Sequence, residues 1–182
     1  MVSPRSLLRS LYHLPDRLKH GTRRREAEGR LSARTIGSVL MVCHGNVCRS
    51  PYAAARLNRL VAEEGRAIRV ESAGFIGPNR PSPPELIELA RRRGLDLADH
   101  RSQLLSSPLA KADLVVVMNI RQARSANRDF GVGADRILIL GDIGPGDIDT
   151  REIRDPWGQP LEVYEQVMER LDRCVKRLAD LI

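Results

Sequence analysis

The stretch SVLMVCHGNVCRSP, residues 38–51, decides the fold of this chain, because a strand, a tight turn and a helix start follow one another in it. Residues 38–42 form the apolar, β-branched run that is typical of a buried parallel strand. Pro51 suits the first turn of a helix, where its missing N–H costs no hydrogen bond. The turn over residues 43–50 therefore joins a strand end to a helix start.

The chemistry of this turn predicts a phosphate site that carries its own nucleophile. Several backbone N–H groups and the positive end of the helix dipole point at one place, which suits a dianion. The same field favours the thiolate of Cys43, the reactive form of cysteine. Arg49 offers a planar fork of donors that matches two phosphoryl oxygens. We expect a positive φ at Gly45 and Asn46.

Two motifs carry a resemblance to a known family. Cys-x5-Arg alone occurs in several unrelated phosphatase and sulfur-transfer families. The longer run Val-Cys-x-Gly-Asn-x-Cys-Arg-Ser-Pro at 42–51 resembles the signature of the low-molecular-weight protein tyrosine phosphatases. Asp155-Pro156-Trp157-Gly158 resembles that family's acid loop. The resemblance covers residues 37–182, the predicted phosphatase domain, and leaves residues 1–36 as a basic N-terminal extension.

The pattern of elements predicts a single three-layer α/β domain. Strands are expected at 38–43, 68–72, 113–118 and 136–140, and helices at 50–65, 83–94, 119–129 and 160–181. Such alternation predicts a four-stranded parallel sheet with helices on both faces. The resemblance implies the flavodoxin-like fold of phosphotyrosine phosphatase I. Ligands of such sheets lie at the carboxyl ends of the strands.

Composition agrees with one small domain in a reducing setting. A chain of 182 residues is about one domain in size. No apolar run approaches the roughly 18 to 20 residues that cross a bilayer, and the N-terminus lacks the apolar core of a secretory signal. Three cysteines, two of them in the turn, do not form a disulfide framework. We therefore expect a cytoplasmic protein.

Most of the chain's net positive charge comes from the N-terminal extension. Residues 1–37 hold nine Lys and Arg against three Asp and Glu (9 − 3 = +6), and residues 38–182 hold 21 against 20 (21 − 20 = +1). A nucleic-acid-binding module would show a basic face on the folded domain, so none is expected. The extension is expected to be partly helical or flexible, with Leu7, Leu11, Leu14 and Leu18 near one helical face and Pro15 kinking it. It is either largely solvated, with one or two helical turns, or docked on anionic lipid or an acidic partner.

The resemblance implies a two-step phosphatase mechanism with Cys43, Arg49 and Asp155 as the catalytic residues. Cys43 attacks phosphorus, the loop and Arg49 stabilise the charge, and Asp155 protonates the leaving group. No metal or other cofactor is required, because the loop and Arg49 neutralise the phosphate. The predicted phosphate-binding residues are His44, Gly45, Asn46, Val47, Cys48, Arg49 and Ser50.

The resemblance also implies residues that support the site. Asn46, Ser50, Ser72 and His100 would form the hydrogen-bond network that fixes the loop. Trp157 would line the wall that holds the substrate ring. Cys48 is either a redox partner that protects Cys43 from over-oxidation or a small packing residue, and Cys174 is expected in the core.

Several functions on this fold are weighed against one another. In family members, a branched apolar residue at the position of Val47 accompanies phosphotyrosine, and threonine accompanies phosphoarginine. Val47 therefore favours a protein tyrosine phosphatase, with a protein arginine phosphatase as the alternative. An arsenate reductase would need redox cysteines downstream, where only Cys174 lies, and a phosphate-binding pseudoenzyme would lack part of this catalytic set. Family members often oppose a tyrosine kinase, which makes such a kinase a candidate partner. Asn119 stands where many members carry an acidic anchor for Arg49.

Overall fold

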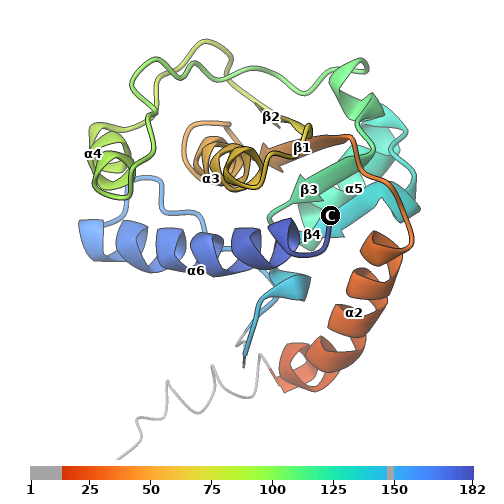
Figure 1. Ribbon diagram of the computed structural model, residues 1–182. Coiled ribbons are helices and arrows are strands. Elements are labelled where there is room, and N and C mark those ends of the chain that lie inside the picture. Colours follow the sequence, from red (N-terminus) through yellow and green to blue (C-terminus); the bar gives the residue numbers. More distant parts are fainter. Residues whose placement is uncertain (1–13, 147–149) are drawn as a thin grey trace, which may run out of the picture.

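The computed structural model describes residues 14–146 and 150–182 and shows a sheet with helices on both sides (Figure 1). The strands are β1 (Ser38–Cys43), β2 (Arg69–Gly74), β3 (Leu114–Val117) and β4 (Ile137–Ile139). The helices are α2 (Leu14–Ser32), α3 (Arg49–Glu63), α4 (Pro84–Arg92), α5 (Ile120–Phe130) and α6 (Leu161–Ala179). Short 3-10 helices cover Leu109–Lys111, Ala134–Arg136 and Leu140–Ile143. The predicted strands and helices of the domain are confirmed, with ends shifted by a few residues.

The four strands are parallel and lie in the order β2-β1-β3-β4. β1 is therefore central, and its last residue, Cys43, is paired with Gly74 at the end of β2. The strand order reverses beside β1, which is where an open parallel sheet leaves a crevice for a ligand. The fold thus places the turn after Cys43 at the expected ligand-binding edge.

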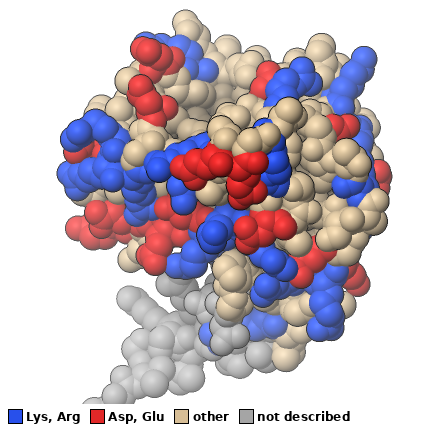
Figure 2. All heavy atoms as spheres, in the orientation of Figure 1, with Lys and Arg blue, Asp and Glu red and all other residues tan. Residues whose placement is uncertain are grey.

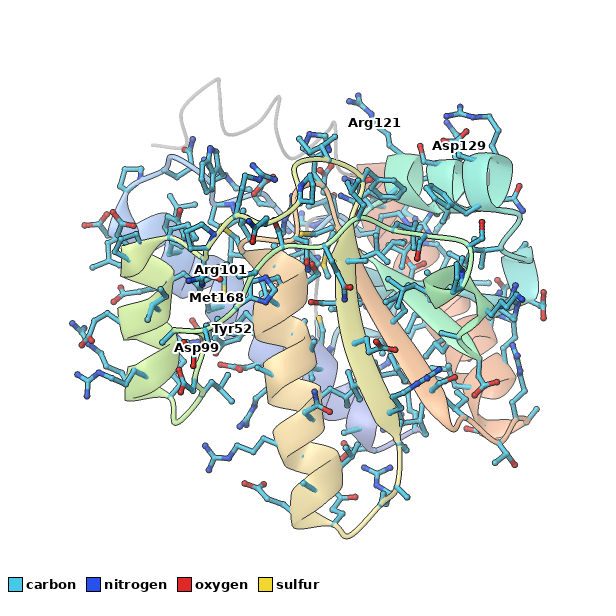
Figure 3. The ribbon with its side chains drawn as sticks, turned by 90° about the horizontal axis from the view of Figure 1, so that it is seen from above. Tyr52, Asp99, Arg101, Arg121, Asp129 and Met168 are labelled. Carbon is cyan, nitrogen blue, oxygen red and sulfur yellow. The ribbon has the colours of Figure 1, made fainter. Side chains whose placement is uncertain are left out.

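The two faces of the sheet are covered by different helices. Val39 and Met41 of β1 belong to the core under α3, α4 and α6, whereas Leu40 and Val42 pack toward α5 on the opposite face. Seen from above, α5 and the α3, α4 and α6 layer lie on either side of the sheet (Figure 3). Because both faces are buried, β1, β3 and β4 read as largely apolar runs in the sequence, whereas the edge strand β2 is more polar.

A buried tyrosine locks the helices of the larger layer together. Tyr52 of α3 has no exposed surface, and its hydroxyl contacts the Asp172 carboxylate of α6 at 2.9 and 3.0 Å. Arg93, just after α4, donates to the same carboxylate at 2.8 Å. Burial raises the pKa of Tyr52 to about 12, so it remains a hydrogen-bond donor at neutral pH. These contacts hold α3 in place, and with it the end of the 43–50 turn, which leads into this helix.

The extension is more ordered than the expected one or two helical turns. α2 is a single helix of 19 residues, and Pro15 lies in its first turn, where proline does not interrupt helical hydrogen bonds. Ala27 and Leu31 are buried with the α6 layer, and Leu18 is exposed. Glu28 accepts a hydrogen bond from Arg177 of α6 at 2.9 Å. Leu7 and Leu11 of the predicted amphipathic face lie outside the described residues.

Charges of both signs are interleaved on the face that carries α6 and α2 (Figure 2). Several arginines of the extension pair with acidic side chains, as in Arg23 with Asp16 and Arg24 with Glu28. No helix in the described part of the chain is long and apolar enough to span a bilayer. The boundary between residues 36 and 37 remains a prediction.

Candidate functional site

The turn from Cys43 to Ser50, here called the phosphate loop, wraps around the sulfur of Cys43. The backbone N–H of Asn46 donates to Cys43 Sγ at 3.2 Å, and the hydroxyl of Ser50 donates at 3.1 Å. Cys43 is buried and lies at the N-terminal end of α3, which begins at Arg49. Two donors and a helix N-terminus therefore stabilise negative charge on this sulfur.

Gly45 and Asn46 differ in backbone conformation within the phosphate loop. Asn46 has φ of 51°, in the left-handed region that asparagine tolerates, as expected. The positive φ predicted for Gly45 is wrong: Gly45 is not among the residues with positive φ. A β-carbon at Gly45 would lie 2.6 Å from the guanidinium of Arg80, so a larger residue here would displace the end of that side chain.

A hydrogen-bond network holds the phosphate loop from below. The Asn46 side-chain amide donates to Ser50 Oγ at 2.9 Å and to Ser72 Oγ at 2.8 Å. His100 Nε2 lies 2.7 Å from the backbone oxygen of Asn46, and the Gln103 N–H donates to Asn46 Oδ1 at 2.9 Å. The structure thus brings together Asn46, Ser50, Ser72 and His100, and adds Gln103, which the motifs did not indicate.

Arg49 connects the phosphate loop to the segment 150–158, here called the acid loop. Its side chain is buried; Nη1 donates to the backbone oxygen of Ile153 at 3.1 Å and Nη2 pairs with the Asp155 carboxylate. Its Nε is buried without a hydrogen-bond partner in the described structure. Asn119 caps α5 by accepting from Gln122 N–H at 3.0 Å, so Ile153 and Asp155 anchor Arg49 instead of an acidic residue at 119.

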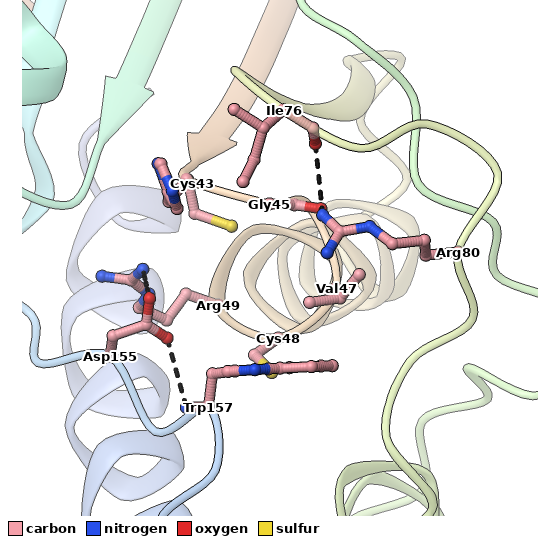
Figure 4. A pocket seen from close by; sticks show the side chains of 10 residues that line it. Cys43, Gly45, Val47, Cys48, Arg49, Ile76, Arg80, Asp155 and Trp157 are labelled. Carbon is pink, nitrogen blue, oxygen red and sulfur yellow. Dashed lines mark hydrogen bonds and ion pairs between the residues drawn. The ribbon is translucent and has the colours of Figure 1, made fainter.

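The phosphate loop and the acid loop enclose a pocket of about 270 Å³ (Figure 4). The predicted residues His44, Gly45, Val47, Cys48 and Trp157 line it. Trp157 is 55% exposed, and its backbone N–H donates to Asp155 Oδ1 at 3.3 Å. Buried Asn46 and Ser50 do not line the pocket; they lie behind it. Trp157 therefore stands at the mouth of the pocket and not in the core.

Arg80 and Ile76 also line this pocket and were not predicted. Arg80 follows β2 and donates to the backbone oxygen of Gly45 at 2.9 Å and to that of Gly77 at 2.8 Å. In Figure 4 it lies across the pocket from Asp155. Arg80 is an isolated arginine in a Gly/Pro-rich segment and belongs to no recognisable motif. Its place at the site depends on the tertiary fold, which brings this segment against the phosphate loop.

The remaining thiols are buried and unpaired. Burial, together with Cys43 and Asp155 nearby, raises the pKa of Cys48 to about 12, so this thiol is protonated at neutral pH. Burial likewise raises the pKa of Cys174, which lies in the core as expected. His44 is exposed at the rim, and its backbone oxygen accepts from Phe75 N–H at 2.8 Å.

No group of three or more His, Cys, Asp or Glu side chains that could hold a metal ion occurs among residues 14–146 and 150–182. The reaction without a metal or cofactor remains a prediction.

Comparison with known families and proteins agrees with this geometry. Residues 38–182 match the family model described as low molecular weight phosphotyrosine protein phosphatase. The chain is 30% identical to a protein-arginine-phosphatase of Bacillus subtilis over 78% of this chain and 93% of that protein. It is 32% identical to EpsP of Ralstonia nicotianae, a probable low molecular weight protein-tyrosine-phosphatase, over 77% of this chain and 92% of that protein.

Solved structures share the fold. A mutant of the YwlE arginine phosphatase with a phosphorylated active site serine has a TM-score of 0.72 at 29% identity, covering 79% of this chain and 93% of that one. The tyrosine phosphatase Wzb from Escherichia coli, in complex with sulphate, has a TM-score of 0.70 at 28% identity, covering 80% of this chain and 98% of that one.

Proposed function

This chain belongs to the low-molecular-weight protein tyrosine phosphatase family and is a phosphatase of phosphorylated proteins. We propose that it hydrolyses phosphotyrosine through a phosphocysteine on Cys43. One observation carries the proposal: the sulfur of Cys43 accepts hydrogen bonds from Asn46 N–H and Ser50 Oγ at a helix N-terminus. The acid loop faces that sulfur across the pocket.

The first step transfers the phosphoryl group to sulfur. The thiolate of Cys43 attacks phosphorus, the S–P bond forms and the bond from phosphorus to the tyrosyl oxygen breaks. Loop amides stabilise the three equatorial oxygens, and the unpartnered Nε of Arg49 is a ready donor to one of them. A bound phosphoryl group would also compete with Asp155 for Arg49.

Asp155 serves as the acid and then as the base. A tyrosyl oxygen leaves poorly as an anion at neutral pH, so Asp155 gives it a proton as the bond breaks. Its carboxylate is half exposed and faces the pocket, which allows it to reach the leaving oxygen. In the second step Asp155 takes a proton from water, water attacks phosphorus, and inorganic phosphate leaves as the Cys43 thiolate returns.

The lining of the pocket supports an aromatic substrate. Val47, Ile76 and Trp157 offer apolar surfaces on which a tyrosine ring can pack. Arg49 and Arg80 already place two cations at the pocket, whereas Asp155 is its single carboxylate among the residues that line it. A guanidinium leaving group would meet repulsion there, and a neutral phenol would not.

The second candidate is protein arginine phosphatase activity. The similarity to the Bacillus subtilis protein-arginine-phosphatase favours it, since the identity to that protein is close to the identity to EpsP. Asp155 would then pair with the leaving guanidinium.

The deciding experiment compares kcat/KM on matched peptides that carry phosphotyrosine, phosphoarginine or phosphoserine. We expect phosphotyrosine to be hydrolysed fastest, because Val47, Ile76 and Trp157 fit its ring. A preference for phosphoarginine would transfer the assignment to the second candidate. Absence of hydrolysis of all three, and of a small aryl phosphate, would refute the phosphocysteine mechanism.

The cellular setting follows from the same chemistry. Three unpaired cysteines and a thiolate nucleophile suit a reducing cytoplasm, and a tyrosine kinase that modifies the same proteins would be a natural partner.

Contact of the extension with anionic lipid or an acidic protein should be tested by deleting residues 1–12. Deletion through residue 34 would also remove the packed α2 helix. Equal binding to anionic vesicles before and after the short deletion would dismiss a lipid contact made by residues 1–12.

A further inference from the structure

A groove of about 500 Å³ adjoins the catalytic pocket. Arg80 and Trp157 line both, so they form the wall that the pocket and the groove share. The groove continues along the proline-rich segment 81–84, which leads into α4, and past Gln159 of the acid-loop side. In Figure 4 the ring of Trp157 extends toward the side of the pocket on which Arg80 lies. A ligand in the pocket therefore has a continuous path into the groove.

The lining of the groove favours an apolar occupant. Pro81, Pro83 and Pro84, which have no N–H to donate, line the groove together with the aromatic residues Trp157 and Tyr164. Apolar and aromatic linings with a few polar groups are typical of sites that bind a side chain by burial.

Ser82 is a groove-lining residue with an unpartnered polar group. The residue is 1% exposed, and its buried hydroxyl has no hydrogen-bond partner in the described structure. A buried hydroxyl without a partner is costly, and most such groups in proteins are paired. A backbone N–H or C=O of a bound peptide would supply the missing partner.

We propose that this groove binds the stretch of the phosphoprotein substrate that flanks the phosphorylated residue, with one apolar side chain held among the prolines, Trp157 and Tyr164. The inference rests on the proposed function, since it requires a phosphorylated side chain in the neighbouring pocket. An extended peptide advances about 3.3 Å per residue, so a position within about three residues of the phosphorylated one reaches the groove. The groove thus makes the enzyme read sequence beside the phosphate.

The test is a scan of phosphopeptides, using whichever phosphorylated residue the enzyme hydrolyses faster. Each of the three positions on either side is occupied in turn by leucine or by serine, and kcat/KM is measured. We expect one position at which leucine is favoured about tenfold, which is the scale expected for burying part of such a side chain. Leucine-to-serine ratios of kcat/KM near one at every position would contradict peptide binding in the groove.

Variants at Gln159 locate the preference. Gln159 is exposed and lines the groove, so Gln159→Trp should fill it without disturbing the core. The leucine-to-serine ratio should then fall to about one. The matched control, Gln159→Ala, leaves the groove open and should keep the ratio. A preference that survives in Gln159→Trp, or that is lost equally in Gln159→Ala, would contradict the assignment.

A small aryl phosphate separates this inference from the function on which it rests. Such a substrate reaches the pocket without occupying the groove. If it is hydrolysed while no flanking preference exists, the proposed binding in the groove is refuted and the phosphatase assignment stands. If it is not hydrolysed by the unmodified protein, the proposed function itself fails.

Discussion

The phosphate loop and the acid loop face each other across one pocket, yet they are held in place by different parts of the chain. The phosphate loop is fixed from within the domain, by Asn46 and its partners Ser72, His100 and Gln103. The acid loop is held, besides its contacts with Arg49, by side chains of the helices α6 and α2. Arg170 of α6 donates to the backbone oxygen of Glu152 at 2.8 Å, and other contacts come from α2.

The contact between α2 and the acid loop centres on Asp16. Its carboxylate accepts hydrogen bonds from Thr150 Oγ1 at 3.2 Å, from Arg151 N–H at 3.3 Å and from Arg23 at 2.9 Å. Burial would raise the pKa of Asp16, but these hydrogen bonds outweigh it and keep the pKa below its ordinary value. α2 precedes the part of the chain that matches the family model, residues 38–182. A helix outside that region thus helps to hold the loop that carries the proposed acid.

Because the two loops are held by different contacts, we expect substitutions that loosen one loop to affect the rate in a different way from substitutions that loosen the other. In the proposed mechanism the phosphate loop acts on the phosphoryl group, whatever alcohol leaves. The acid loop matters most when the leaving oxygen needs a proton. The dependence of the rate on the acidity of the leaving phenol therefore reports which loop a substitution disturbs.

The largest effect is expected for Cys43→Ser. Without the thiolate, turnover should fall by at least about 10⁴-fold. Phosphate should still bind, because the loop amides and Arg49 are unchanged. Trp157 is the chain's only tryptophan and lies at the pocket, so its fluorescence can follow a phosphate titration. Near-normal turnover in this variant would contradict the role of Cys43.

The next effect is expected for Asp155→Asn. Its kcat on a phosphotyrosine peptide should fall by about 10²- to 10⁴-fold, the usual contribution of a general acid. An aryl phosphate with an acidic phenol needs no proton, so its rate should fall far less. Equal losses on both substrates would show that Asp155 is not the acid.

Ser72→Ala should have an intermediate effect on the phosphate loop. It removes one of the two acceptors of the Asn46 side-chain amide. We expect kcat/KM to fall about tenfold, consistent with one lost buried hydrogen bond, and by the same factor on good and poor leaving groups. The control is Ser107→Ala at an exposed position, which should leave both rates unchanged. A loss confined to poor leaving groups would contradict this division between the loops.

Asp16→Asn should have the smallest effect, and it should be confined to the acid loop. Loosening Thr150 and Arg151 lets Asp155 leave its best position, so kcat should fall about threefold on poor leaving groups and stay unchanged on good ones. Glu28→Gln is the matched control, because Glu28 lies on the same helix but pairs with Arg24 and Arg177. If both variants behave alike, α2 stabilises the fold in general and does not position the acid.

The same contrast explains what the sequence could predict. The phosphate loop lies within residues 43–50, so its strand, turn and helix start leave a local pattern, and the motif identifies its residues. The positive φ predicted for Gly45 was wrong, and its contact with Arg80, which is 35 residues away in the chain, could not be read from the motif. Arg80, Gln103 and Asp16 reach the site only through tertiary folding. No spacing rule connects Asp16 to Thr150, which lies 134 residues further on.

The most direct test of the account is to trap the covalent intermediate on Cys43. Asp155→Asn protein is mixed with an aryl phosphate whose acidic phenol leaves without a proton, quenched within a turnover and digested for mass spectrometry. We predict a phosphoryl group on the peptide that contains Cys43, because the S–P bond forms before water attacks and the missing base slows its hydrolysis. Phenol release without any phosphorylated Cys43, in repeated quenches across the first turnover, would contradict the mechanism.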